Sequence, residues 1–113
     1  MRIDLNWLAG ELATVYRDET QTERQYTIAQ DWQARLQRQI RATGDAAIAN
    51  PDRPALTENA TMLVDMQYVL IDEIIHLEGK QAQQDQIKAQ IAELAARVGL
   101  TLADLEKLEH GHA

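Results

Sequence analysis

The sequence predicts an all-α protein, and three observations lead to that prediction. Of 113 residues, 45% are hydrophobic but only 4% aromatic, and Phe is absent. The core must therefore be aliphatic, which suits packing between helices better than between sheets. Apolar residues also recur at helical spacing on both sides of one strong break. The break itself is NPDRP, residues 50–54, where the residues before each proline are biased away from the helical conformation.

Stripes of residues spaced by seven run along both halves of the chain. Before the break they are Leu8, Val15, Thr22, Ala29, Leu36 and Thr43, with Leu12, Glu19, Tyr26, Gln33, Ile40 and Ala47. After it they are Leu63, Leu70, Leu77, Gln84, Ile91 and Val98, with Met66, Glu73, Lys80, Ile87 and Leu94. We call these stripes the predicted seam, because such spacing is typical of coiled-coil contacts. They predict an antiparallel long-helix hairpin or a small helical bundle.

Local signals predict where the helices begin and end. We expect helices near residues 3–17, 20–48, 56–78, 81–98 and 102–109, and the two central pairs remain open to being continuous. Thr20 and Glu23 fit a capping box, Thr57 fits an N-cap, and Gly79 marks a kink or an end. Gly99 ends a helix, and Thr101–Asp104 is a second capping box. We predict one domain over residues 1–113: a hairpin about 3–98 with its turn at 49–55, and a C-terminal cap about 99–113.

The predicted seam contains a polar section. If the chain folds back near residue 52, Glu19, Thr22 and Glu23 come close to the residues from Lys80 to Gln84. Such residues set register and partner number at some expense of stability. There are two alternatives to this interpretation. In one, the helix breaks at Gly79 and the seam ends there. In the other, the polar section binds a ligand.

Glu73 and His76 are the candidates for metal binding. A Glu-x-x-His pair on one helix face, with further Glu ligands from facing helices, resembles the half-motif of ferritin-like bundles. That resemblance implies a dimeric ferritin-like metal protein in which Glu19 or Glu23 supplies another carboxylate. The alternative is that His76 is an ordinary helix residue, and we predict no cofactor.

Composition also excludes several classes of function. The net charge is −7, made up of −1 over residues 1–50 and −6 over residues 51–113. Binding to nucleic acid depends on neutralising phosphates with Lys and Arg, so we do not expect nucleic acid as a partner. The chain has no Cys, no Ser and no Gly-rich phosphate loop. It therefore lacks a thiolate metal site, a serine nucleophile and a nucleotide cradle, and we predict that it is not an enzyme.

Glu58, Asp65 and Asp72 form an acidic stripe in which neighbours are seven positions apart, and there is no Lys or Arg from residue 58 to residue 78. One interpretation is a solvated helix face. The other is a docking surface for a basic partner. Its composition is similar to that of small acidic phage proteins that imitate DNA, among them several anti-CRISPR proteins, which implies an inhibitor.

The C-terminal stretch LAARVGLTLADLEKLEHG, residues 94–111, resembles the helix-turn-helix of phage-repressor (Xre-like) proteins. The matching places are Leu94, Ala95, Gly99, Leu100, Thr101, Leu105, Leu108, Glu109 and Gly111. The resemblance implies a DNA-binding transcriptional regulator. Family members expose cationic or amide side chains on the second helix, whereas this helix offers Asp104, Glu106 and a single cation, Lys107. The alternative is a structural cap on the helical domain.

We therefore predict a non-enzymatic acidic helical module for protein–protein interaction, acting as an adaptor, an assembly subunit or an inhibitor. The partners expected are a basic protein and a second copy of the chain, because two helices alone cannot bury the predicted seam. Trp7 and Trp32 lie beside seam residues, which favours core packing, and an exposed Trp would instead anchor an interface. An N-terminus carrying Asp4 and Glu11 predicts no signal peptide, so we expect a cytoplasmic protein without membrane contact.

Overall fold

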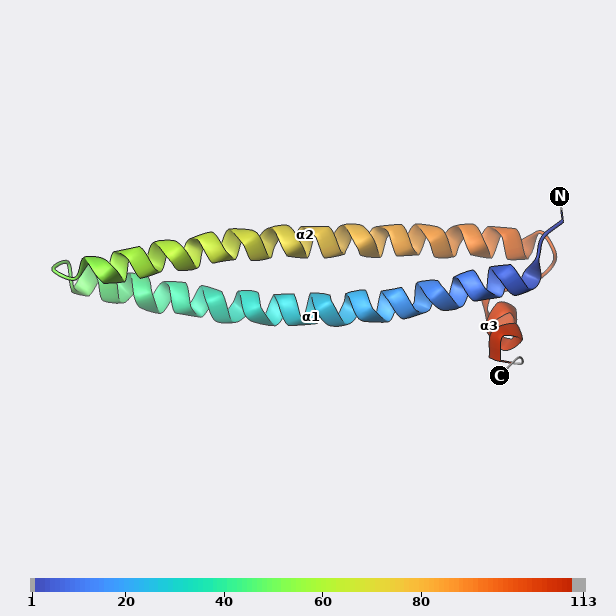
Figure 1. The fold of residues 1–113 in the computed structure, drawn as a ribbon, viewed down its shortest axis with the longest axis horizontal. Helices are drawn as coiled ribbons and strands as arrows, with labels where there is room; N and C mark the ends of the chain where they lie inside the picture. Colours follow the sequence, from blue (N-terminus) through green and yellow to red (C-terminus); the bar gives the residue numbers. More distant parts are fainter. Residues whose placement is uncertain (1, 111–113) are drawn as a thin grey trace. The chain divides into compact units, whose positions relative to one another are not determined.

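The structure is a computed structural model that describes residues 2–110, and these residues form three α-helices and no strand. The helices are α1 (Leu5–Ala49), α2 (Pro54–Ala96) and α3 (Leu102–His110) (Figure 1). The predicted all-α class is confirmed. The chain divides into two compact units, which we describe separately. The terminal unit is Met1–Glu23 with Gly79–Ala113, and the turn unit is Arg24–Glu78.

The ends of the two long helices follow from local chemistry. Asp4 caps α1, since its Oδ1 accepts hydrogen bonds from the backbone amides of Asn6 (3.0 Å) and Trp7 (3.2 Å). After α1 ends, the Asn50 side-chain amide donates to the Ala46 carbonyl at 2.8 Å. Pro54 opens α2, where a missing N–H costs no helical hydrogen bond. The predicted N-cap at Thr57 is wrong, because the proline starts the helix three residues earlier.

Both long helices are continuous, so the predicted interruptions near residues 18–20 and 79–80 do not occur. The hydroxyls of Thr20 and Thr22 donate to the carbonyls of Tyr16 and Asp18, each four residues earlier. A hydroxyl bonded back to a carbonyl of its own helix is not available to cap a new one. The capping box predicted at Thr20–Glu23 is therefore wrong. Gly79 lies in the interior of α2 rather than at its end.

In the turn unit, α1 and α2 form an antiparallel hairpin joined by residues 50–53 (Figure 1). Its buried core consists of Ala29, Ile74 and Leu77. Tyr26 and Leu70 pack against this core and remain partly exposed. Tyr26 also donates a hydrogen bond from its Oη to Oε1 of Glu78 at 3.0 Å. All of these residues lie in the part of the hairpin farther from the turn.

In the terminal unit, α3 packs against the pair formed by α1 and α2, and three helices close one core. The buried residues are Leu8, Ala9, Leu12, Val15, Ile91, Ala95 and Leu105. Leu105 of α3 is completely buried, and Leu102 and Leu108 pack beside it. A third helix covers the apolar side that two helices would leave open, which is why this core is complete. In the described part of the chain, no helix has the length and apolarity needed to cross a membrane.

One of the predicted seam stripes is wrong. Every predicted seam residue of α1 is buried or half-buried, and so is the Leu63 stripe of α2 up to Ile91. Its predicted companion is exposed at Met66, Glu73, Lys80 and Ile87. The stripe that faces α1 is Ala60, Gln67, Ile74, Gln81, Lys88 and Ala95. The two candidate stripes flank the leucines on opposite sides, and each mixes polar with apolar residues.

The predicted polar section of the seam is present in the terminal unit. Nε2 of the buried Gln84 donates to Oγ1 of Thr22 at 2.9 Å, and Thr22 donates onward to the Asp18 carbonyl at 2.8 Å. Lys88, rather than Lys80, pairs with Glu19. The hydrogen bond to Glu19 raises the pKa of Lys88, and partial burial opposes that rise. A hydrogen-bonded pair from facing helices defines their register at this point.

We expect Thr22→Val to destabilise the protein by about 1–3 kcal/mol, because it leaves the buried Gln84 amide without its acceptor. The Oε1 atom of Gln84 already has no hydrogen-bond partner in the structure. The double variant Thr22→Val, Gln84→Leu removes both polar groups and should recover most of the loss. Urea unfolding followed by circular dichroism measures both effects. A single variant as stable as the wild type would contradict the pairing.

Candidate protein-docking surface

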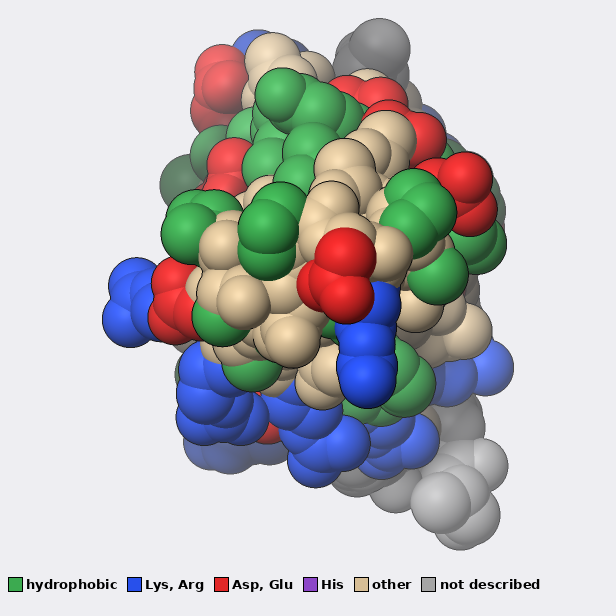
Figure 2. Space-filling view, turned by 90° about the vertical axis from the view of Figure 1, so that its left-hand side faces the viewer, with side chains coloured by type: hydrophobic (Ala, Val, Ile, Leu, Met, Phe, Trp, Pro, Cys, Tyr) green, Lys and Arg blue, Asp and Glu red, His purple; other side chains and the backbone are tan. Residues whose placement is uncertain are grey.

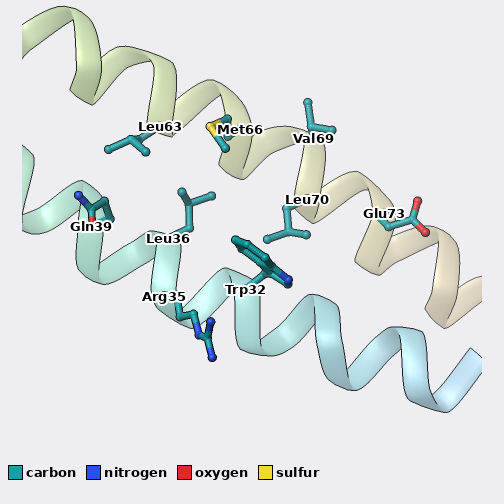
Figure 3. Close-up of a pocket in the computed structure, with 9 residues that line it drawn as sticks. All are labelled: Trp32, Arg35, Leu36, Gln39, Leu63, Met66, Val69, Leu70 and Glu73. Atoms are coloured by element: carbon teal, nitrogen blue, oxygen red, sulfur yellow. The ribbon is translucent and has the colours of Figure 1, made fainter.

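An apolar groove runs between α1 and α2 on one side of the turn unit (Figure 3). Its volume is about 690 Å³. The residues that line it are Trp32, Arg35, Leu36, Gln39, Leu63, Met66, Val69, Leu70 and Glu73. Figure 3 shows Leu36, Leu63 and Leu70 in the space between the helices, with the Trp32 ring beside Leu70. The floor is thus aliphatic and belongs to the seam between the two helices.

Large apolar side chains on the walls of the groove are exposed. Trp32 is 57% exposed, Met66 54% and Val69 71%. Ile28 and Met62, one helical turn from Trp32 and Met66, are also more than half exposed. The polar atoms come from Gln39 and from one charge on each helix, Arg35 and Glu73. An aromatic ring with a flexible methionine beside a leucine floor is typical of a surface that binds another apolar surface.

The hairpin around the groove has almost no buried side chains. None of residues 30–73 is buried, although the α1 seam residues and the members of the Leu63 stripe among them are half-buried. Two helices in contact cover only the stripe between them and leave both neighbouring stripes in water. In the terminal unit α3 covers such a stripe, whereas in the turn unit no described element does. The groove therefore leaves apolar side chains uncovered beside the core of the turn unit.

The two helices of the turn unit carry opposite charge. Residues 24–49 of α1 hold four arginines against two aspartates, a net charge of +2. Residues 54–78 of α2 hold five acids and no Lys or Arg, a net charge of −5. Figure 2 shows Lys and Arg side chains gathered along the lower edge, over α1. Arg35 pairs within α1 with Asp31 at 3.2 Å, and no ion pair among the described residues joins these two segments.

The predicted acidic stripe borders the groove wall on α2. Glu58, Asp65 and Asp72 are all exposed, on the side of α2 turned away from the seam. Residues three or four apart on a helix are neighbours, which places Met62 and the groove-lining Val69 beside this stripe. The stripe is thus the acidic flank of an apolar surface.

Glu73 and His76, the candidate metal ligands, are both exposed on α2. Among the described residues no group of three or more His, Asp or Glu side chains is arranged to hold a metal ion. Glu19, which the ferritin-like hypothesis would bring to the metal, is instead paired with Lys88. Glu73 lies on the wall of the groove, so the structure brings it together with apolar residues rather than with other ligands.

The C-terminal hairpin has the local geometry that its sequence predicts, as far as the described residues reach; Gly111 lies outside them. Gly99 has a φ of +76°, and the Leu100 amide donates to the Ala95 carbonyl at 2.9 Å, which closes the end of α2. Thr101 and Asp104 form a reciprocal capping box, with N–H to side-chain oxygen distances of 2.9 and 3.3 Å. The hydrogen bond from the Thr101 backbone lowers the pKa of the Asp104 carboxyl.

In the terminal unit α3 directs its leucines into the core. Its side chains of Glu106 and Lys107 are exposed, and the described helix carries three acids against that one lysine. Glu106 accepts a hydrogen bond from Tyr16 of α1, and this bond raises the pKa of the tyrosine. This is the arrangement expected of a structural cap, and its outer surface is acidic where a DNA-reading helix is cationic.

The groove was not predicted from the sequence, because the stripe that contains Met66 was assigned to the seam between the helices. With Met66 assigned to the seam and Trp32 assigned to core packing, the sequence interpretation predicted an incompletely buried seam but no apolar groove on its flank. Trp7 and Trp32 are in fact both more than half exposed. The signal available was a helix whose apolar residues extend beyond one stripe, from Met62 and Met66 to Val69.

Fold and surface together define a class: an all-α protein with one closed three-helix core and one two-helix segment that exposes an apolar groove. The chain has no significant match to a protein-family model, to a curated protein or to a solved structure.

Proposed function

We propose that this protein is a non-enzymatic helical module for protein–protein interaction, and that its docking surface is the groove of the turn unit. The observation that carries the proposal is the groove itself, where Trp32, Met66 and Val69 are each more than half exposed over a leucine floor. Roles as an adaptor, an assembly subunit or an inhibitor all require such a surface. The occupant presents an apolar helical surface, since its side chains have to fill a trough between two helices.

The terminal unit supports the proposal by comparison within the same chain. There a third helix, α3, inserts Leu105 against α1 and α2 and leaves that leucine with no exposed area. A partner whose apolar helical surface packs on the groove would do the same for Leu36, Leu63 and Leu70. Burial of apolar area supplies most of the free energy of such association, at about 25 cal/mol per Å².

Site-specific photo-crosslinking tests the docking surface. A benzophenone amino acid placed at Met66, in the native cells, should give a covalent protein adduct on irradiation, because the side chain lies on the groove wall. The same amino acid at Tyr68 should give little adduct. Tyr68 is a matched control, since it is 65% exposed on the same helix but does not line the groove. Adducts are detected by denaturing electrophoresis and identified by mass spectrometry.

Absence of an adduct from Met66, or equal yields from both positions, would contradict the groove as the docking surface. Circular dichroism of each labelled protein checks that helix content is unchanged. Both positions are largely exposed, so neither substitution removes a residue from the core.

A further inference from the structure

We infer that the occupant of the groove is a second copy of this chain, with α1 of each copy lying on α2 of the other. This rests on the proposed docking function of the groove and names the partner for it. The result is a four-helix bundle in which the two-helix layer of one turn unit packs on that of the other. The two copies are related by a two-fold axis parallel to the helices. Such an interface is self-complementary, since each copy contributes the same surface.

Charge is the first argument for a second copy. The groove is lined by one cation from α1, Arg35, and one anion from α2, Glu73. Over the turn unit, the net charge is +2 on α1 (residues 24–49) and −5 on α2 (residues 54–78). A surface that is basic along one helix and acidic along the other is complementary to itself when one copy is turned over onto the other. In this arrangement, α1 of the second copy is the basic partner of the acidic stripe.

Charge also selects one of the two possible arrangements. A two-fold axis along the helices puts α1 on α2 of the second copy, with both turns at the same end. An axis across the helices would instead put α1 on α1 and α2 on α2. That arrangement would face two segments of −5 toward each other, and two of +2. Like charges across an interface disfavour association, so the first arrangement is preferred.

The chain positions of Arg38 and Asp65 agree with this arrangement. Arg38 lies 12 residues before Asn50, and Asp65 lies 12 residues after Arg53. A two-fold axis along the helices keeps each residue at its distance from the turn, so Arg38 of one copy comes level with Asp65 of the other. Both side chains are exposed, and each lies one helical turn from a residue that lines the groove, Arg35 on α1 and Val69 on α2. In helical bundles charged residues at such flanking positions pair across the interface.

The apolar residues complete the interface. α1 presents Ile28 and Trp32, and α2 presents Met62, Met66 and Val69, all more than half exposed in the single chain. Stacking two such layers places these five side chains and the leucine floor between four helices. This is the core that residues 30–73 lack in one copy.

Sedimentation equilibrium over a dilution series tests the second copy. The wild type should show a species of twice the 12.8 kDa chain mass. Val69→Glu should reduce the mass to that of one chain, because it places a carboxylate in the dimer core. Tyr68→Glu should leave the dimer intact, as it alters a side chain of similar exposure outside the groove. A monomeric wild type, or a dimer lost with Tyr68→Glu but kept with Val69→Glu, would overturn the inference.

A charge exchange between Arg38 and Asp65 tests the arrangement. Arg38→Glu and Asp65→Arg should each weaken the dimer about tenfold, since two symmetry-related contacts change from attraction to repulsion. Mixing the two variants in equal amounts should restore wild-type affinity, because both contacts in the mixed dimer are again between opposite charges. The double variant should recover for the same reason. In the rejected arrangement, neither single variant would weaken the dimer, because like charges would replace like charges.

The crosslinking experiment separates this inference from the proposed function. An adduct from Met66 that contains two copies of the chain agrees with both. An adduct with a different protein, together with a monomeric wild type, keeps the docking function and overturns the second copy. No adduct from Met66 overturns the docking function itself.

Discussion

Leu105→Ala is expected to destabilise the terminal unit by about 2–5 kcal/mol. Leu105 is completely buried and is the residue through which α3 enters the core formed with Leu8, Leu12 and Ala95. Truncation removes the apolar contacts of the side chain and leaves a cavity that three helices cannot readily close. Because α3 has only nine residues, it is not stable as a helix without that contact.

Urea unfolding measures the loss, and amide hydrogen exchange shows where it occurs. The amides of α3 should lose protection first, whereas those near Ile74 and Leu77 in the turn unit should change less. Val98→Ala is the control, because Val98 is exposed and its truncation should change stability by less than about 0.5 kcal/mol. An unfolding midpoint unchanged by Leu105→Ala would mean that α3 does not close the core.

Gly79→Pro is expected to cost about 3 kcal/mol or more, and Gly79→Ala to stabilise the protein by about 0.5–1 kcal/mol. Gly79 lies inside α2, where proline would lack the N–H of a helical hydrogen bond and would clash with the preceding turn. Alanine has no such conflict, since a Cβ at this position meets nothing within 4 Å. Thermal or urea unfolding of the two variants measures these opposite changes in stability.

Gly99→Ala is the matched comparison, because the same substitution there should be destabilising. Gly99 has a φ of +76°, a conformation that a residue with a Cβ adopts only with strain. If α2 ended at Gly79, as one sequence interpretation holds, proline at that position would be tolerated. Equal stability of Gly79→Pro and the wild type would therefore contradict a continuous α2.

Residues whose signal is local were predictable. The break at residues 50–54, the turn at Gly99 and the capping box of Thr101 and Asp104 all involve neighbouring residues, and all are found. The predicted caps at Thr20 and Thr57 failed although their local signals look similar. The hydroxyl of a threonine inside a continuous helix donates to a carbonyl four residues earlier, as that of Thr20 does. Whether a threonine caps a helix or lies inside one depends on how stable the helical conformation is on both sides of it.

The candidate site shows the same limit at a larger scale. Glu58, Asp65 and Asp72 were predicted as an exposed stripe, and their exposure is confirmed. The groove beside them was not predicted, since Trp32 and Met66 could belong either to the seam or to its flank. The identity of an apolar residue beside a leucine stripe does not indicate on which side of that stripe the neighbouring helix packs.

The sequence by itself determined the all-helical class, the turn at residues 50–53 and the leucine stripe along α2, because propensity, proline and periodicity act within a few residues. Only the tertiary structure decided which flank of that stripe meets α1. It placed Ala60, Gln67 and Ile74 against α1 and left Met66 and Val69 exposed. The physical reason is that a helix has two equivalent flanks beside any apolar stripe, and the choice depends on the shape and polarity of the facing helix, which is distant in the chain.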